Sequence, residues 1–365
     1  MENKRNILIC PLEWGLGHAA RMIALATRLR ELNFNVIAGA GEKHLAFFRT
    51  EIPDIACIDF PGFKPGYSRY LPQYLTLLFQ TPFLIYHIIS EHFRLKKIIR
   101  ENRIDIVISD NRFGLWNRKI KTVYVTHQLR IPFPGIFRIF EFAGIMLHRA
   151  VIRRYSVCLI PDMPDNKINF SGRLSHGVRL PGNAIYIGIL SRFTGMISSP
   201  EESPVSFRHN TVILSGPEPQ RSILEHKLAG IMKDIAPRTV FLGGSPERGS
   251  VATKAGNIIF FDHLPGVAMK ELICGSERII ARSGYTSIME LVSLNRSALL
   301  IPTPGQTEQE YLARWLRERG WFTCAMQKQL RNALPEAESK IIPSEEIISL
   351  SRSLLDMALR IISED

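Results

Sequence analysis

The residues best suited to chemistry lie in two short turns within the stretch Glu277 to Leu316. Ser283 and Gly284 follow one apolar run, and Pro304 to Gln306 follow the next. In a parallel α/β sheet, ligands bind at the carboxyl ends of the strands, so two such turns are expected side by side. Hydroxyl groups and free backbone N–H groups at a helix start favour an anion. The residues that would supply them here are Ser283, Gly284, Thr286 and Ser287, and they predict a site for a diphosphate.

A second candidate for chemistry is the glycine loop Leu12 to His18, which contains Trp14, Gly15 and Gly17. It follows a short apolar run and precedes a helical pattern, so it predicts a βαβ opening in which the backbone approaches a ligand. His18 directly after the loop is placed for acid–base work, because imidazole titrates near neutral pH. The alternatives are a plain tight turn for the loop and a structural cap for His18.

Two other predicted strands also end in polar residues. Asp105 to Ser109 is followed by Asp110, and Thr122 to Thr126 is followed by His127. Asp110 and His127 are therefore second candidates for a catalytic base, lining the same cleft from the first half of the chain. The alternative interpretation is that both clusters are caps and turn residues.

The pattern that must position these residues is an alternation of strands and helices in both halves of the chain, which predicts an α/β fold of two doubly wound, Rossmann-like domains facing a cleft. A chain of 365 residues exceeds the usual limit of one core. We expect an N-terminal acceptor-binding domain over 1–195, a linker over 196–210 that loses the apolar periodicity, and a C-terminal donor-binding domain over 211–345. A final amphipathic helix, 346–365, is expected to cross back to the first domain.

Composition limits the class of protein. The formal charge of +12 indicates an anionic partner. The 5 cysteines are scattered without CxxC spacing, which favours reduced thiols in a cytoplasmic protein. The first apolar run is too short for a signal peptide, and the uncharged run Leu71 to Ser90 contains prolines and glutamines, so no transmembrane helix is expected.

No GxxxxGK[ST], HExxH or DxD-type pair occurs at a strand end, which argues against an ATPase and a metalloprotease.

Two apolar and basic stretches, Tyr70 to Arg100 and Ile131 to Arg154, carry aromatic residues followed by clusters of Lys and Arg. This pattern suits helices in a membrane interface with their cations on anionic head groups, and it predicts a peripheral association with a membrane. The alternative is core helices with solvated basic ends. The cations are not concentrated in one run and no recognition module is present, so no nucleic-acid partner is expected.

The stretch from Arg282 to Ala313, RSGYTSIMELVSLNRSALLIPTPGQTEQEYLA, resembles the donor-binding region of the family 28 glycosyltransferases of GT-B fold. The best known member of that family adds N-acetylglucosamine to a lipid-linked peptidoglycan precursor. The loop ending in Gly17 and His18 is similar to the family's acceptor-side loop. The resemblance is strongest from Phe260 onward and weaker across the rest of the chain.

The resemblance implies roles for individual residues. The carboxylate of Glu290 would bind the ribose of a uridine diphosphate donor, and backbone near Phe261 and Leu264 would frame the base. Ser283, Gly284 and Ser287 would face the diphosphate, preceded by Arg282. Gln309 matches the first of two glutamines that hold the donor sugar in the family. The second position is Glu310 here, which replaces an amide with an acceptor-only carboxylate and leaves the choice of sugar open.

The loop Ser215 to Arg221 stands where the family has a glycine-rich diphosphate loop. It keeps Gly216, but Pro217 and Pro219 replace flexible residues, so Arg221 is expected to supply positive charge instead. The expected mechanism is direct, inverting transfer without a metal or cofactor, with the UDP-sugar as co-substrate. His18 would deprotonate the acceptor hydroxyl, while helix N-termini and Arg221 would stabilise the leaving diphosphate.

The acceptor implied by the resemblance is a lipid-linked or cell-envelope glycan, reached from the inner face of the cytoplasmic membrane. Two alternatives stay open. Enzymes that hydrolyse nucleotide-linked sugars share a GxGHxxxR opening, which Gly15 to Arg21 matches apart from the spacing of the arginine. A non-catalytic subunit that holds a nucleotide sugar or a lipid is the other alternative, and the presence of both halves of a cleft argues against it.

Overall fold

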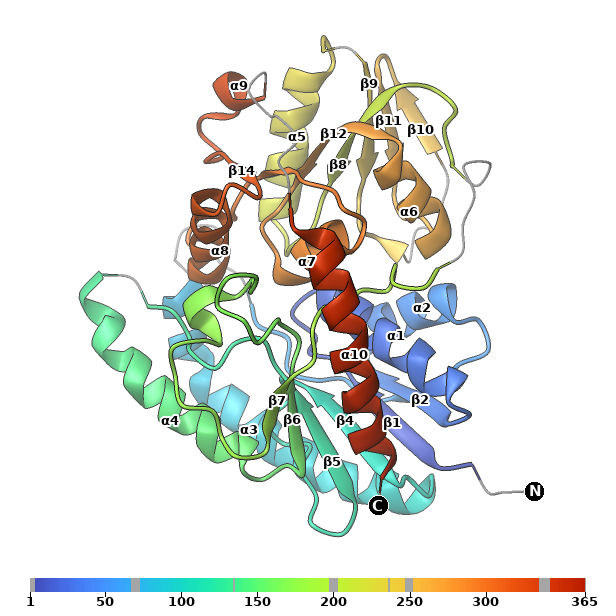
Figure 1. Cartoon of the computed structure of the whole chain (residues 1–365), viewed down its shortest axis with the longest axis vertical. Coiled ribbons are helices and arrows are strands. Elements are labelled where there is room, and N and C mark those ends of the chain that lie inside the picture. Colours follow the sequence, from blue (N-terminus) through green and yellow to red (C-terminus); the bar gives the residue numbers. More distant parts are fainter. Residues whose placement is uncertain are drawn as a thin grey trace.

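The protein consists of two seven-stranded sheets, one above the other in the computed structural model of Figure 1. The structure describes residues 4–66, 73–133, 135–196, 203–235, 237–246, 252–334 and 342–364. Each sheet is almost wholly parallel and has helices on its faces, which confirms the predicted α/β fold of two doubly wound halves.

The first sheet has the order β3-β2-β1-β4-β5-β6-β7, and all its pairs are parallel. Its strands are β1 (Asn6–Cys10), β2 (Asn35–Ala40), β3 (Ala56–Asp59), β4 (Ile106–Asp110), β5 (Lys121–Val125), β6 (Val157–Ile160) and β7 (Ala184–Tyr186). Its helices are α1 (Leu16–Glu31), α2 (Glu42–Glu51), α3 (Gln73–Glu101), η1 (Gly135–Phe140), α4 (Glu141–Ile152) and η2 (Gly172–Leu174). The winding reverses between β1 and β4, and such a switch point opens a crevice at the carboxyl ends of the two strands.

The second sheet has the order β10-β11-β9-β8-β12-β13-β14, with only the edge strand β10 antiparallel among the described strands. Its strands are β8 (His209–Ile213), β9 (Arg238–Leu242), β10 (Ala252–Ala255), β11 (Ile258–Phe261), β12 (Ser276–Ala281), β13 (Leu299–Leu300) and β14 (Thr323–Cys324). Its helices are α5 (Gln220–Met232), α6 (Gly266–Cys274), α7 (Tyr285–Ser293), α8 (Thr307–Glu318) and α9 (Leu330–Ala333). Because β8, β12 and β13 are neighbours, the turns that follow them meet at one edge.

Alternation along the strands gives each face of the first sheet its own core. Ile7 and Ile9 of β1 face α1 and α2, whereas Leu8 faces α3. The last helix, α10 (Ser344–Ser363), starts beside the second sheet and runs down to the first, as the red helix of Figure 1 shows. Ile347 packs in the core of the second sheet, while four further apolar residues of α10 pack with α1 in the core of the first: Leu355, Ala358, Leu359 and Ile362. The helix therefore links the two cores.

The chain leaves the first sheet at Tyr186 and enters the second at His209. The predicted linker 196–210 falls within this interval, although its residues 197–202 lie outside the described part of the chain. The division into domains at those residues stays a proposal.

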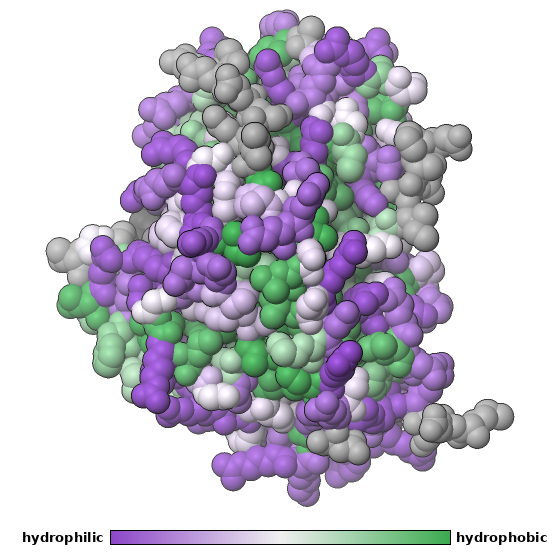
Figure 2. Space-filling model, viewed as in Figure 1, coloured by the Kyte–Doolittle hydropathy of each residue, from purple (hydrophilic) through white to green (hydrophobic). Residues whose placement is uncertain are grey.

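Helices α3 and α4 carry large apolar side chains on their outer surface. In Figure 2, drawn in the view of Figure 1, apolar atoms reach the surface at the left, where α4 lies. The exposed residues include Phe79, Phe83, Tyr86, Phe93, Ile139, Phe142 and Met146. Among the described residues, no helix is both long and apolar enough to span a membrane.

Candidate active site

The crevice at the switch point of the first sheet brings His18 and Asp110 together. His18 lies in the first turn of α1, and Asp110 is the last residue of β4. His18 Nδ1 is 2.9 Å from Asp110 Oδ2, and no partner of His18 Nε2 is found among the described residues. The carboxylate is fully buried while the imidazole stays partly exposed. The pair therefore has the form of an acid–base site: an oriented imidazole with one nitrogen open.

Arg21, one helical turn after His18, is the hub of the buried polar groups. Its Nε donates to Asp110 Oδ2 at 2.9 Å, and its Nη2 makes a second contact with Asp110 Oδ1 and lies 2.8 Å from His18 Nδ1. Burial would raise the pKa of the Asp110 carboxyl, but Arg21 and His18 lower that pKa to about 2. Burial lowers the pKa of His18 below its usual value, against the opposing effect of Asp110. The neutral form of His18 is therefore favoured.

His127, after β5, joins this cluster to the second sheet. Arg21 Nη1 donates to His127 Nδ1 at 2.8 Å, so Nε2 carries the proton of the neutral ring and donates to Glu308 Oε1 at 2.8 Å. Glu308 is in the first turn of α8, on the far side of the cleft. Burial would raise the pKa of Glu308, but the His127 contact holds it below its usual value. The ring of His127 also stacks on Tyr285 at 4.1 Å.

The glycine loop touches the expected donor turn directly. Thr286 Oγ1, in the first turn of α7, donates to the Gly17 carbonyl at 3.0 Å. A Cβ atom on Gly17 would lie 3.2 Å from Thr286 Oγ1, so only glycine fits this close approach without displacing Thr286. Gly284 is the N-cap of α7, and no side chain caps the helix. Its first N–H groups are therefore available to an anion beside His18.

Three turns of the second sheet surround that helix start. Ser283 Oγ, at the end of β12, donates to the Gln309 carbonyl at 2.9 Å. Gly216, after β8, lies beside Thr303, after β13, and has a φ of 100°. Thr303 Oγ1 is buried and has no hydrogen-bond partner within the described ranges. Buried hydroxyl groups are normally paired, so this atom is suited to a missing ligand.

Gln309 and Glu310 both fold back onto the turn after β13. Gln309 Oε1 accepts from the Thr303 N–H at 2.9 Å, and Glu310 Oε1 accepts from the Gly305 N–H at 2.9 Å. Each side chain thus holds the shape of the turn with one oxygen. Glu310 stands where the resemblance leads us to expect a glutamine. Its carboxylate has a structural role in this turn, because a carboxylate accepts well from backbone N–H groups.

Glu290, the expected ribose ligand, is engaged in a buried ion cluster. Arg192 Nε donates to Glu290 Oε1 at 2.9 Å, and Arg192 Nη1 donates to Glu51 Oε1 at 2.8 Å. Glu51 is the last residue of α2, so the cluster joins the first half of the chain to α7. Glu290 Oε2 has no hydrogen-bond partner among the residues described. One carboxylate oxygen therefore stays available for a hydroxyl group.

The two arginines expected at the donor site already have protein partners. Arg221 is ion-paired with Glu218 at 2.6 Å and donates to the Gly243 carbonyl at 2.6 Å. Arg282 is buried and donates to the Pro302 carbonyl at 3.1 Å and the Gln220 carbonyl at 2.8 Å, and burial lowers its pKa to about 10. Arg282 thereby ties together the turns after β8, β12 and β13, whereas the charge of Arg221 is partly balanced by Glu218.

The remaining predicted residues lie around the same edge. Phe261 ends β11 and Leu264 precedes α6, and both are buried in the core of the second sheet. Ser287 is half-buried in α7, and Ser215 is half-buried directly after β8. Trp14 and Gly15 lie half-buried in the loop before α1. The structure thus brings the predicted residues to the facing edges of the two sheets.

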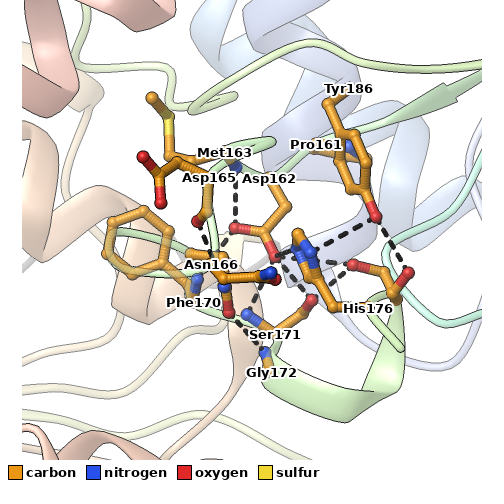
Figure 3. A network of polar contacts seen from close by, with 12 residues as sticks. Pro161, Asp162, Met163, Asp165, Asn166, Phe170, Ser171, Gly172, His176 and Tyr186 are labelled. Atoms are coloured by element: carbon orange, nitrogen blue, oxygen red, sulfur yellow. Dashed lines mark hydrogen bonds and ion pairs between the residues drawn. The ribbon is translucent and has the colours of Figure 1, made fainter.

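A network around Asp162 fixes the loop after β6 (Figure 3). The buried carboxylate accepts from the backbone N–H groups of Phe170 at 2.8 Å and Ser171 at 3.0 Å, and it lies 3.1 Å from His176 Nε2. The preceding carbonyl, that of Pro161, accepts from the Tyr285 hydroxyl at 2.7 Å. Because Tyr285 stacks on His127, this loop supports the orientation of both rings.

Sequence reasoning gave no role in this site to three residues that organise it: the hub Arg21, Glu308 across the cleft, and Arg192 at Glu290. Arg21 carried a signal, because it ends the GxGHxxxR-like opening and follows His18 by three residues on one side of a helix. The other two have no local signal, because their partners are 181 and 98 residues away in the chain.

Part of the second half of the chain matches a known family model. Residues 252–349 match the glycosyltransferase family 28 C-terminal domain. A UDP-N-acetylglucosamine--N-acetylmuramyl-(pentapeptide) pyrophosphoryl-undecaprenol N-acetylglucosamine transferase of Desulforudis audaxviator is 36% identical over 84 residues, 22% of each chain. An uncharacterized glycosyltransferase of Methanosarcina acetivorans is 24% identical over 245 residues, 62% of each chain. The matched segments thus cover less than two thirds of both curated relatives.

The whole fold also has solved counterparts. The glycosyltransferase SnogD of Streptomyces nogalater superposes with a TM-score of 0.57 over 99% of this chain and 96% of its own, at 16% identity. At that identity the similarity concerns the fold alone. The chain therefore has the GT-B fold, and residues 252–349 match the C-terminal domain of glycosyltransferase family 28.

Proposed function

We propose that the protein transfers a sugar from a UDP-sugar to an acceptor hydroxyl, with inversion at the anomeric carbon and without a metal. The observation that carries this proposal is the contact between Thr286 and Gly17. It places the open N-terminus of α7 beside the His18–Asp110 pair. This arrangement supports the proposal, because direct transfer requires the site for the leaving diphosphate to lie close to the base.

In the proposed step, His18 Nδ1–H donates to Asp110 and His18 Nε2 takes the proton of the acceptor hydroxyl. The acceptor oxygen forms a bond to the anomeric carbon as the bond from that carbon to the β-phosphate oxygen breaks, which releases UDP. The first N–H groups of α7, together with Gly216 and Thr303, would meet the negative charge that develops on the diphosphate. His127 is the second candidate for the base, but both of its ring nitrogens are already bonded.

The donor is proposed to be a uridine nucleotide carrying a hexose or an N-acetylhexosamine. The family match and the name of the Desulforudis relative support this class. Glu290 Oε2 would accept from the ribose hydroxyls while Arg192 holds Oε1. The backbone near Phe261 and Leu264 would frame the base, and Gln309 with Glu310 would contact the sugar.

The acceptor is proposed to be a lipid-linked or cell-envelope glycan, reached by a protein bound peripherally to the inner face of the cytoplasmic membrane. The name of the same relative, which specifies an undecaprenol-linked acceptor, supports this class. The exposed apolar side chains on α3 and α4 support a membrane surface nearby.

A panel of nucleotide sugars, incubated with lipid-linked and soluble glycan acceptors, tests the proposal when the products are identified by mass spectrometry. We expect one UDP-sugar to give a glycosylated acceptor and an equal amount of UDP. Free sugar released without any acceptor would indicate a nucleotide-sugar hydrolase instead. Binding of a nucleotide sugar by calorimetry with no product of either kind would indicate a non-catalytic subunit.

A further inference from the structure

Asn111 lies directly after Asp110, at the carboxyl end of β4 where the winding of the first sheet reverses. Its φ of 52° is in the left-handed region, which asparagine adopts more readily than most residues. The backbone N–H of Asn111 still donates to the Val125 carbonyl at 3.1 Å, so the strand ends in a defined bend. The proposed reaction uses Asp110 but gives Asn111 no role. A residue held in a sparsely populated conformation beside a proposed catalytic group is a candidate for a function of its own.

Two buried side chains hold the Asn111 amide from behind. The Tyr124 hydroxyl is 3.1 Å from Asn111 Oδ1 and 2.8 Å from His148 Nε2. Tyr124 is fully buried in β5, and His148 is buried in α4. The His148 ring also packs edge-on against Phe113, with ring centroids 5.4 Å apart. The hydroxyl therefore connects the bend after β4 to two rings that have little freedom to move.

The direction of these hydrogen bonds follows from His148 Nδ1, which is buried and has no hydrogen-bond partner in the described part of the chain. Burial lowers the pKa of His148 to about 4, so the ring is neutral and carries one N–H. If that proton were on Nδ1, a buried donor would lack an acceptor, which is rarer in proteins than an unpaired acceptor. His148 Nε2–H therefore donates to the Tyr124 hydroxyl, and the hydroxyl donates to Asn111 Oδ1.

The amide nitrogen of Asn111 is therefore turned away from Tyr124. Among the described residues Asn111 Nδ2 has no hydrogen-bond partner, and it is not one of their buried unpaired atoms, so it is open to solvent. It carries two N–H donors and no acceptor. By contrast, the carboxylate of Asp110 is fully buried and already bonded to His18. An oriented donor with one open side, next to the group that orients His18, is suited to an oxygen atom of a bound molecule.

We propose that Asn111 is an acceptor-binding residue whose Nδ2–H donates to a second oxygen of the acceptor, while His18 deprotonates the reacting hydroxyl. Tyr124 and His148 are positioning residues that hold the amide in this orientation. The inference rests on the proposed transfer reaction and narrows its acceptor class. The acceptor carries at least two oxygens close together, as a sugar or another polyol does. A molecule with a single isolated hydroxyl group would leave the amide without a partner.

The tautomer of His148 tests the orientation of the amide without any ligand or turnover. Long-range proton–nitrogen NMR of the full-length protein distinguishes a ring protonated at Nε2 from one protonated at Nδ1. We expect the proton on Nε2. A proton on Nδ1 would turn the amide of Asn111 around, with its oxygen toward the crevice, and would overturn the inference.

Transfer kinetics test the contact itself, with the glycan acceptor that gives product in the panel of nucleotide sugars and acceptors. That acceptor is compared with analogues in which each hydroxyl group other than the reacting one is replaced by hydrogen in turn. The test variants are Asn111→Ala and Tyr124→Phe. The matched control is Asn33→Ala, because Asn33 has a similar φ of 68° but is exposed after α1, at the opposite edge of the sheet. Thermal unfolding checks that each variant is folded.

We expect Asn111→Ala to raise the KM of the acceptor by about tenfold, the effect of one lost hydrogen bond, with the Kd of UDP unchanged. Tyr124→Phe should act in the same direction but less, and Asn33→Ala should change neither constant. One deoxy analogue should lose a similar factor with the wild-type protein and nothing further with Asn111→Ala. An unchanged KM in Asn111→Ala, or full additivity of the two losses, would overturn the inference and leave the transfer reaction intact. No product from the wild-type protein with any acceptor would contradict the proposed function itself.

Discussion

At the scale of single residues, the site depends on the contacts among Arg21, Asp110 and His18. Asp110 is held ionised by Arg21 and His18, and it favours the His18 tautomer with Nδ1 protonated. Burial then lowers the pKa of His18, so the ring is in its basic form near neutral pH. A histidine prepared in this way can accept a proton through Nε2 without first losing one.

Asp110→Asn tests this arrangement through the pH dependence of kcat/KM. His18 acts in its neutral form, so activity falls as pH drops through the His18 pKa. The Asp110 charge raises that pKa, so its removal should move the acid limb to lower pH. The maximal rate should fall by about 10² or more because the ring loses its orienting partner. An acid limb that stays in place or moves to higher pH would exclude Asp110 as the partner of the base.

Most residues of the proposed donor site could be named from the sequence, because they lie in the stretch Arg282 to Ala313 that resembles the family, and the structure brings several of them to one edge of the second sheet. The ion pairs of Glu290 with Arg192 and of His127 with Glu308 could not be predicted from the sequence. Each joins side chains far apart in the chain, and no local periodicity encodes which of two distant charges will face each other. Such contacts depend on the packing of the two sheets, which a single sequence does not specify.

At the scale of elements, helices α7 and α8 connect the two halves of the chain. Both begin at the carboxyl edge of the second sheet, and both reach the first half in their first turn, through Thr286 and Glu308. The strands and helices that position them could be predicted because apolar runs alternate with glycine and proline turns. The β13 strand is only Leu299–Leu300, shorter than the apolar run 298–301, although Ile301 N–H still donates to the Ala281 carbonyl and the Ala298 carbonyl accepts from Thr323 N–H.

Glu308→Gln should slow transfer without weakening donor binding. The amide keeps an acceptor for His127 Nε2–H but loses the charge that orients the ring, and through Arg21 and Asp110 the effect reaches His18. We expect kcat to fall by about tenfold, because a tenfold change corresponds to the weakening of one charge-assisted hydrogen bond. The Kd of UDP should stay unchanged. Glu318→Gln, an exposed residue of the same helix, is the control. If Glu308→Gln weakens UDP binding while kcat is retained, Glu308 is a donor ligand rather than a positioning residue.

Glu290→Gln should weaken UDP binding by about tenfold, because a carboxylate that accepts from ribose hydroxyls is replaced by a weaker acceptor. Calorimetry with UDP measures the effect. The control is Glu51→Gln, which removes the other carboxylate on Arg192 but is not expected to touch the donor. Similar losses in both variants would mean that the ion cluster supports the site only indirectly.

At the scale of the whole molecule, α10 links the two cores. Its C-terminal turns pack against α1 while its start packs against the second sheet. The helix, its amphipathic pattern and its return to the first domain could be predicted from the sequence, but not which of its apolar residues, such as Leu359, pack in which core. That choice is made by the path of the whole chain, which ends at the first sheet in Figure 1.

Leu359→Ala should lower the free energy of unfolding by about 2–5 kcal/mol, because it leaves a cavity in the core of the first sheet. Leu350→Ala on the same helix is the control, since Leu350 is 37% exposed and should cost less than about 1 kcal/mol. Urea denaturation followed by circular dichroism measures both. Equal effects of the two substitutions would show that the C-terminal turns of α10 are not part of the core.

The central claim is direct inverting transfer with His18 as the base, and proton NMR of the product formed from an α-linked UDP-sugar tests it most directly. The wild-type protein is predicted to give a β-linked product. His18→Ala is predicted to lower kcat by about 10² to 10⁴ while the Kd of UDP stays within about threefold. An α-linked product, or near-normal turnover in His18→Ala, would contradict this account.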